Sequence, residues 1–282
     1  MRILLGQLAP TPGDLAGNVD RIHRTLTGHP AELAVFPELF VTGYRVGDRV
    51  HQLALKEGDS TWQALHELAR QHHSSIVVGA PVRSPERPGE VQNAALLFHP
   101  DGSMERQVKR FLPTYGPFEE GSFFTPTDRS QAVHISGRPV GLLICYDAFF
   151  PEVSRELALA GAELLIVISA SPVTSRRLFE KVLAARAVEN ACPLLYVNRV
   201  GVEDGVVFGG GSVGFDPRGE PLPFESHPVP DGEPEEAIFT GSLELEEAAR
   251  WRPWRPVLRD VASRPPREPS HPSSSPTRAD RL

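Results

Sequence analysis

Short apolar runs alternate with amphipathic segments along most of the chain. Runs of about four to eight residues that are rich in β-branched side chains are typical of buried strands. Such runs predict strands over residues 2–9, 31–36, 74–80, 93–99, 140–146, 164–170 and 193–198. Strands that alternate with helices indicate an α/β protein. Strands that follow one another directly, near 74–99 and after 205, indicate a mixed sheet.

Three segments between these runs predict helices. The segment "STWQALHELARQHH" begins with Ser60 and carries Gln63 three positions later, which is typical of a helix N-terminus. The segment "PEVSRELALAGA" places Pro151 at a first helical position. The segment "SRRLFEKVLAARAVENA" repeats apolar side chains at helical spacing. Its predicted face consists of Leu178, Val182, Ala185 and Val188.

The C-terminal segment differs in composition from the rest of the chain. From about Ser263 the sequence "SRPPREPSHPSSSPTRADRL" is rich in Pro, Ser and Arg and contains almost no apolar side chains. Segments of this kind cannot bury enough apolar surface to fold. No repeat of fixed period occurs before it. We therefore expect one domain over residues 1–262 and a disordered tail over residues 263–282.

Composition and charge exclude several classes of protein. The 282 residues are 40% hydrophobic, which is enough to bury a large core. A net charge of −7, with no cluster of Lys and Arg before the tail, argues against a nucleic-acid partner. No apolar run approaches the roughly 20 residues that span a bilayer, and no signal-type segment begins the chain, so we expect a cytoplasmic protein without a membrane partner. The two cysteines, Cys145 and Cys192, have no ligand spacing and predict neither a metal site nor a disulfide framework.

Two segments place chemically active side chains directly after predicted strands. In "GLLICYDAFFPE", residues 141–152, Cys145 closes an apolar run, and the loops after strands are where α/β proteins often carry reactive groups. Alone, an unpaired cysteine there is more often a small core residue, as Cys192 also is. In "AVFPELFVTGY", Glu38 follows a strand among apolar neighbours, where poor hydration raises a carboxyl pKa. A capping or solvated glutamate is the alternative interpretation.

A third segment, "QVKRFLPTYGPFEEGSFF", places Lys109 before an aromatic-rich loop, where a surface lysine is the alternative. Along the chain, the segment with Glu38 comes first, then the segment with Lys109 and then the segment with Cys145. The segments "AARAVENACPLLYVNRVG" and "FGGGSVGFDPRGE" follow them. Together they resemble the nitrilase or carbon-nitrogen hydrolase superfamily, from Gln7 to about Pro256. The resemblance implies a four-layer α-β-β-α sandwich in which two mixed sheets pack face to face.

The resemblance also implies roles for individual residues. Glu38 matches the general base of the family, Lys109 its transition-state lysine and Cys145 its nucleophile. A second glutamate follows the lysine segment in relatives, and Glu120 matches it, with Glu119 as the alternative. The expected substrate contacts are Tyr115, Tyr146, Phe149, Ala170 and Ser171. Structural hydrogen bonds around the site are expected from Arg186, Glu189 and Asn198.

The activity that the resemblance implies is hydrolysis of a carbon–nitrogen bond through a cysteine thioester, without a metal or an organic cofactor. The sequence "CYD" after residue 144 is more similar to amidases and N-carbamoyl hydrolases than to nitrilases. We therefore expect a small linear amide as substrate, with ammonia as product. An N-carbamoyl amine or amino acid is second, and a nitrile third.

Other functions stay open from the sequence. A glutaminase-like ammonia supplier is one, although Ser122 stands where the branch that feeds NAD synthetases often has arginine. A catalytically silent binding module and an acyltransferase are alternatives of a different class.

Relatives assemble through their outer helices, so we expect a homodimer or a larger homo-oligomer. The segment "RWRPWRP", with Trp251 and Trp254, either reaches across that interface or covers the core of its own domain.

Overall fold

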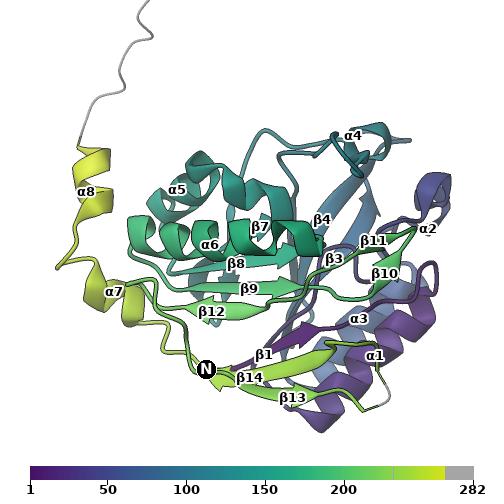
Figure 1. The fold of residues 1–282 in the computed structure, drawn as a ribbon, viewed down its shortest axis with the longest axis horizontal. Coiled ribbons are helices and arrows are strands. Elements are labelled where there is room, and N and C mark those ends of the chain that lie inside the picture. The colour runs from purple at the N-terminus through teal and green to yellow at the C-terminus, as the bar shows by residue number, and fades with distance from the viewer. Residues whose placement is uncertain (231, 264–282) are drawn as a thin grey trace, which may run out of the picture.

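Two mixed β-sheets form the centre of the protein (Figure 1). The computed structural model describes residues 1–230 and 232–263. The seven-stranded sheet has the order β13-β14-β1-β2-β3-β4-β5 and consists of β1 (Arg2–Gln7), β2 (Leu33–Val35), β3 (Ser75–Arg83), β4 (Val91–Phe98), β5 (Met104–Val108), β13 (Glu225–Pro228) and β14 (Ala237–Ser242). The five-stranded sheet has the order β12-β9-β8-β7-β6 and consists of β6 (Ala132–Ile135), β7 (Arg138–Ile144), β8 (Leu164–Ser169), β9 (Leu194–Asn198) and β12 (Val213–Phe215).

Helices and a small hairpin complete the fold. The hairpin pairs β10 (Val202–Glu203) with β11 (Val206–Val207). The helices are α1 (Leu15–Gly28), α2 (Val50–Leu53), α3 (Ser60–Gln71), α4 (Glu120–Phe123), α5 (Pro151–Leu159), α6 (Arg176–Asn190), α7 (Glu247–Trp251) and α8 (Val257–Ala262). Short 3₁₀ turns are η1 (Gly47–Arg49), η2 (Cys145–Phe149) and η3 (Val173–Ser175).

Each sheet combines parallel and antiparallel neighbours, as the sequence predicts. In the first sheet, β1, β2 and β3 run parallel, whereas β4 and β5 are added as antiparallel hairpins. In the second, β7, β8 and β9 run parallel between antiparallel edge strands. All seven predicted apolar runs form strands. The pattern did not predict β5 and β6, which carry several half-exposed or exposed side chains.

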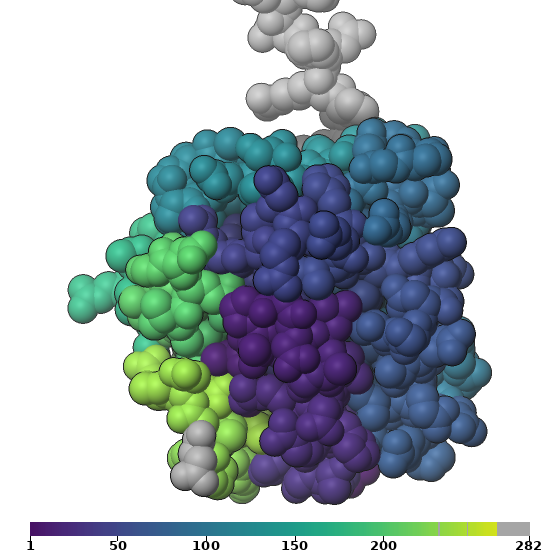
Figure 2. Space-filling model, turned by 90° about the vertical axis from the view of Figure 1, so that its right-hand side faces the viewer, coloured from purple at the N-terminus to yellow at the C-terminus, as the bar shows by residue number. Residues whose placement is uncertain are grey.

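Alternation of side chains along β1 shows how the layers pack. Ile3 and Leu5 belong to the core cluster that contains the strands of the five-stranded sheet, so they lie between the two sheets. Leu4, between them, packs with Ile22 of α1 and Leu65 of α3 on the opposite face. The two helices cover that outer face, and they contribute to the purple and blue surface in Figure 2. On the other side, α5 and α6 lie over the five-stranded sheet (Figure 1). The predicted four-layer α-β-β-α arrangement of two mixed sheets is confirmed.

Two details of the predicted helices are wrong. The N-cap of α3 is Asp59, whose carboxylate accepts a hydrogen bond from the backbone N–H of Trp62 at 2.8 Å, rather than Ser60. The buried face of α6 is shifted from the predicted one, and Leu178 is 54% exposed. The residues of α6 that are buried are Phe179, Leu183, Arg186, Ala187 and Asn190.

The ends of the described chain bear on two further predictions. Residues 264–282, which make up nearly all of the predicted tail, lie outside the described residues. Within residues 1–230 and 232–263, no helix combines the length and the apolar character needed to cross a membrane.

Candidate active site

The predicted site residues converge at one edge of the two sheets. Glu38 follows β2, Cys145 follows β7 and Ala170 follows β8, and each of these strands is parallel to its central neighbours. Lys109 follows β5, which runs in the same direction as β3 because two antiparallel pairings separate them. The carboxyl ends of these strands therefore meet, where α/β folds commonly hold their ligands.

Lys109 forms the centre of a buried ionic cluster. Its Nζ donates to Oε1 of Glu38 at 2.6 Å and to Oε1 of Glu120 at 2.7 Å. The side chains of Lys109 and Glu38 are completely buried, and that of Glu120 is 3% exposed. Oε2 of Glu38 accepts the backbone N–H of Ala170 at 2.8 Å. Of the two adjacent glutamates, Glu120 is the one that contacts Lys109.

Burial and charge set the protonation of this cluster. Burial raises the pKa of Glu120 to about 7, although the charge of Lys109 opposes the rise. Burial alone would lower the pKa of Lys109, but the charges of Glu120 and Glu38 outweigh it and raise that pKa above its ordinary value. Lys109 is therefore a permanent cation at neutral pH.

Cys145 is buried beside these charges. Its side chain belongs to the core cluster, as expected for a cysteine that serves only as a small core residue. It also lies close enough to Glu38 and Lys109 for their charges to act on it. Burial, reinforced by Glu38, raises the pKa of the Cys145 thiol well above its ordinary value. The thiol is thus protonated at rest, and a base must remove its proton before it can attack. Cys192, by contrast, is fully buried, and its Sγ lies near the carbonyl of Ala162.

The backbone at Cys145 has a conformation that favours glycine. Its φ is 49°, in the left-handed region, which costs a non-glycine residue on the order of 1–3 kcal/mol. Two side chains hold this turn. The carboxylate of Asp147 accepts the N–H of Ile144 at 3.2 Å and the N–H of Phe111, just beyond Lys109, at 2.9 Å. Arg186 donates to the carbonyls of the turn from α6, which agrees with its predicted structural role.

Three polar residues of the site escaped the sequence interpretation. Asn93 of β4 donates from Nδ2 to Oε1 of Glu38 at 2.8 Å, and Tyr44 donates its hydroxyl to Oε1 of Glu120 at 2.6 Å. Asp147 is the third. The sequence does contain a feature that could have identified each of them. Asn93 is polar within an apolar strand, and Tyr44 and Asp147 lie inside the two segments that hold Glu38 and Cys145.

The predicted substrate contacts divide into two groups. Tyr115, Tyr146 and Phe149 form an aromatic row, with ring centroids 5.6 Å and 5.9 Å apart in that order, and Tyr115 is 55% exposed. Ala170 and Ser171 are buried. Ser171 is held by Asn198, which accepts its N–H at 2.8 Å and donates to its carbonyl at 3.1 Å. The aromatic row is the group that a bound molecule could reach from solvent.

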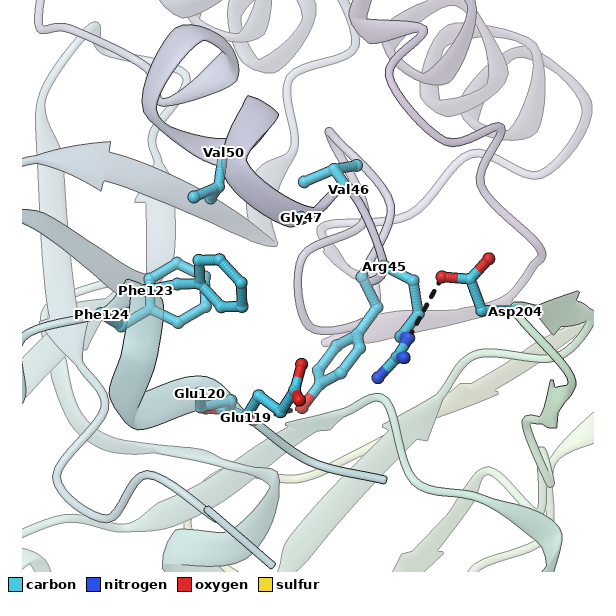
Figure 3. A pocket seen from close by; sticks show the side chains of 10 residues that line it. Arg45, Val46, Gly47, Val50, Glu119, Glu120, Phe123, Phe124 and Asp204 are labelled. Atoms are coloured by element: carbon cyan, nitrogen blue, oxygen red, sulfur yellow. Dashed lines mark hydrogen bonds and ion pairs between the residues drawn. The ribbon is translucent and has the colours of Figure 1, made fainter. Parts of the chain in front are cut away.

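A pocket of about 230 Å³ adjoins the cluster from the side of Tyr44 and Glu120 (Figure 3). Its walls come from the segment after Tyr44, from α4 and its preceding residue, and from the β10–β11 hairpin. They consist of Tyr44, Arg45, Val46, Gly47, Val50, Glu119, Glu120, Phe123, Phe124 and Asp204. Among the described residues, no group of three or more His, Cys, Asp or Glu side chains could hold a metal ion.

A mixed α/β sandwich with a buried Glu–Lys–Glu cluster beside a cysteine defines a class of hydrolase. The chain belongs to the carbon-nitrogen hydrolase family, whose model matches residues 2–253. It is 37% identical over 227 residues to an (R)-stereoselective amidase of Pseudomonas sp, which covers 79% of this chain and 80% of the relative.

A solved structure agrees with this similarity. An amidase from Nesterenkonia sp. AN1, solved as a cysteine-to-alanine variant in complex with butyramide, is 32% identical with a TM-score of 0.74, over 90% of this chain and 95% of that chain. The chain is also 32% identical over 258 residues to a glutamine-dependent NAD(+) synthetase of Aquifex aeolicus. That match covers 89% of this chain but only 44% of the synthetase.

Proposed function

We propose that the protein hydrolyses a small linear amide to a carboxylic acid and ammonia through a thioester on Cys145. The observation that carries the proposal is the position of Lys109, fully buried between Glu38 and Glu120 next to a buried cysteine. Buried charges are costly unless they are paired, and they concentrate at sites where they perform chemistry.

The first half of the reaction forms the thioester. Glu38 takes the proton from the Cys145 thiol, and the thiolate attacks the carbonyl carbon of the amide. The oxygen becomes negative, and the ammonium of Lys109 and the backbone N–H of Tyr146 stabilise it. Glu38 then gives its proton to the leaving nitrogen, the C–N bond breaks, and ammonia departs.

The second half releases the acid. Glu38 takes a proton from water, and the resulting hydroxide attacks the thioester carbonyl while Lys109 again stabilises the oxyanion. The C–S bond breaks, the acid leaves, and the proton on Glu38 returns to Cys145. Glu120 stays beside Lys109 during both halves, and its ionised form balances the charge of Lys109.

The relatives support an amide substrate over the alternatives. The (R)-stereoselective amidase and the amidase crystallised with butyramide both match most of this chain. The similarity to glutamine-dependent NAD(+) synthetases keeps glutamine as the second candidate substrate. N-carbamoyl compounds and nitriles follow.

Ammonia release from a panel of compounds tests the proposal. The panel contains butyramide, glutamine, an N-carbamoyl amino acid and butyronitrile, and the variants are Cys145→Ala and Cys192→Ala. We expect release from butyramide to fall by at least about a thousandfold in Cys145→Ala, because the nucleophile is lost. Cys192→Ala should retain most activity, since Cys192 lies in the apolar core. Release that persists in Cys145→Ala would contradict the thioester route, and release from another panel member alone would reassign the substrate.

A further inference from the structure

Tyr44 contacts the ionic cluster through Glu120. Its hydroxyl donates to Oε1 of Glu120 at 2.6 Å, and this same oxygen accepts from Nζ of Lys109 at 2.7 Å. Burial, reinforced by the charges of Glu120 and Glu38, raises the pKa of Tyr44 well above its ordinary value. The phenol is therefore neutral over the working pH range and acts only as a donor to the carboxylate.

The backbone of Tyr44 is fixed by a buried ion pair between Glu203 of the β10–β11 hairpin and Arg199. Oε2 of Glu203 accepts the N–H of Tyr44 at 3.0 Å and the N–H of Arg45 at 2.7 Å. The other oxygen of Glu203 pairs with Arg199, which follows β9 and is 1% exposed. Figure 2 shows the green β10–β11 hairpin side by side with the dark blue segment after Tyr44. Removing either charge of this pair would leave the other buried and unpaired.

The ring of Tyr44 is also fixed. It meets the ring of Phe118 edge-on at 6.2 Å and the ring of Phe208 at 5.8 Å, and the guanidinium of Arg199 lies 4.1 Å from the centroid of Phe208. Edge-to-face packing favours one ring orientation. With backbone and ring both held, the hydroxyl has its direction set toward Glu120 before any substrate arrives.

The contact matters because Glu120 shares Lys109 with Glu38. When Glu120 is ionised, the charge of Lys109 is divided between two carboxylates. When Glu120 takes a proton, Lys109 pairs with Glu38 alone, and Glu38 becomes a weaker base toward the Cys145 thiol. A hydrogen bond donated to the carboxylate favours its ionised form and opposes that loss.

We propose that Tyr44 is a positioning residue of this site, whose hydroxyl holds Glu120 against Lys109 and thereby leaves Glu38 available as the base. The inference rests on the proposed function and deepens it. Tyr44 touches neither the thiol nor the substrate carbonyl in this scheme and acts through Glu120. It belongs to the same segment as Glu38, so a single loop supplies both the base and the residue that tunes it.

The test compares Tyr44→Phe with Thr42→Val. Tyr44 and Glu120 both line the pocket of Figure 3, and phenylalanine keeps that wall while it removes only the oxygen. Thr42 is buried two residues away, and its hydroxyl donates only to the carbonyl of Gly43, at 3.0 Å, so Thr42→Val removes a hydroxyl without touching the cluster.

The readout is the rate at which iodoacetamide labels Cys145 as a function of pH, followed by mass spectrometry of the Cys145 peptide. The same variants are then assayed for kcat/KM on the best amide. In Tyr44→Phe we expect the midpoint of the acid limb of both pH profiles to shift to higher pH by about one unit. Below that midpoint the rate should be about tenfold lower than in wild type, and above it the rate should recover. Thr42→Val should keep the wild-type midpoint.

A third variant separates the mechanism from a general loss of structure. If Tyr44 acts through Glu120, adding Tyr44→Phe to Glu120→Gln should shift the midpoint no further. An unchanged midpoint in Tyr44→Phe, or an equal shift in Thr42→Val, would overturn the inference. Labelling does not require a substrate, so a wild-type protein that releases no ammonia would refute the proposed function while the labelling profile still decides the role of Tyr44.

Discussion

Lys109 is the residue on which the electrostatics of the site depend. Its ammonium lies 2.6 Å and 2.7 Å from two buried carboxylate oxygens, and the same two carboxylates raise its pKa. Without this cation, Glu38 and Glu120 would be like charges in a dry environment, and at least one of them would take a proton. Lys109 therefore keeps the base in its working form as well as serving the oxyanion.

The titration of Glu120 makes a prediction about stability. Because burial raises its pKa from 4.5 to about 7, the folded protein holds this proton more tightly than the unfolded chain does. The stability gained is fully present below pH 4.5 and is lost as the pH rises to about 7. Glu120→Gln lacks this titration, so the free energy of unfolding of wild type relative to the variant should fall by roughly 3 kcal/mol over that range.

Urea unfolding at several pH values measures this difference. Glu119→Gln is the matched control, because Glu119 is the adjacent carboxylate but is exposed, and its difference from wild type should stay flat. A flat difference for Glu120→Gln as well would show that Glu120 does not titrate in this range.

The sequence predicted some residues of the site and missed others. The sequence singled out Glu38, Lys109, Glu120 and Cys145 through family resemblance, and the structure places the three charged residues in contact beside the cysteine. It did not single out Asn93 or Tyr44, whose partners lie far away in the chain, or Asp147, which accepts from Ile144 three residues away and from Phe111 on a distant segment. Asn93 meets Glu38 across 55 residues and Tyr44 meets Glu120 across 76, and no local pattern records such distances.

At the scale of elements, β3 positions the loop that carries Glu38. Gly79 of β3 donates its N–H to the carbonyl of Pro37 at 3.0 Å. A Cβ at Gly79 would lie 2.5 Å from Cα of Glu38 and 2.4 Å from the backbone nitrogen of Leu39. Backbone atoms cannot move aside as the end of a side chain can, so only glycine allows this approach.

We predict that Gly79→Ala displaces Glu38. The expected loss of stability is about 1–3 kcal/mol, as for other overpacked sites, with a larger relative loss of kcat because the base moves. Gly28→Ala is the control, since a Cβ there meets nothing within 4 Å at the end of α1, and alanine favours helix. Thermal melts and amide turnover of both variants provide the measurement, and wild-type turnover in Gly79→Ala would refute the close approach.

The helices show where periodicity is misleading. The predicted face of α6 used only apolar residues, but the structure buries Arg186 and Asn190 on this helix. Arg186 donates to carbonyls in the turn after Cys145, and Asn190 donates to the hydroxyl of Ser154 in α5. Buried polar residues that satisfy specific partners are invisible to a hydrophobic pattern, and they shift the apparent face of the helix.

At the scale of the whole molecule, we propose a homodimer formed through the outer helices. The two tryptophans of "RWRPWRP" differ in how far they are buried. Trp251 is half-buried with the guanidinium of Arg218 5.4 Å from its ring centroid, whereas Trp254 is 86% exposed. Exposed apolar residues of neighbouring helices include Leu159 and Val261. Exposed apolar side chains that lie together in one patch are typical of interaction surfaces.

Trp254→Asp should weaken this association by at least about tenfold, because buried tryptophans often dominate interface energies. Val202→Asp is the matched control, since Val202 is 62% exposed but lies on the β10–β11 hairpin. Sedimentation velocity over a concentration series compares the three proteins. A wild-type protein that sediments as a monomer at all concentrations would refute the homodimer.

The contacts around Glu38 also determine when the ionic cluster can form during folding. Its carboxylate meets Lys109 across 71 residues and the N–H of Ala170 across 132, so both sheets must be in place before the cluster exists. Contacts between distant parts of a chain form late because closing long loops costs entropy. A newly made or partly folded chain therefore carries Cys145 as an ordinary thiol, without its base. The pairing of base and thiol is therefore a property of the folded chain alone, because it depends on contacts that join both sheets.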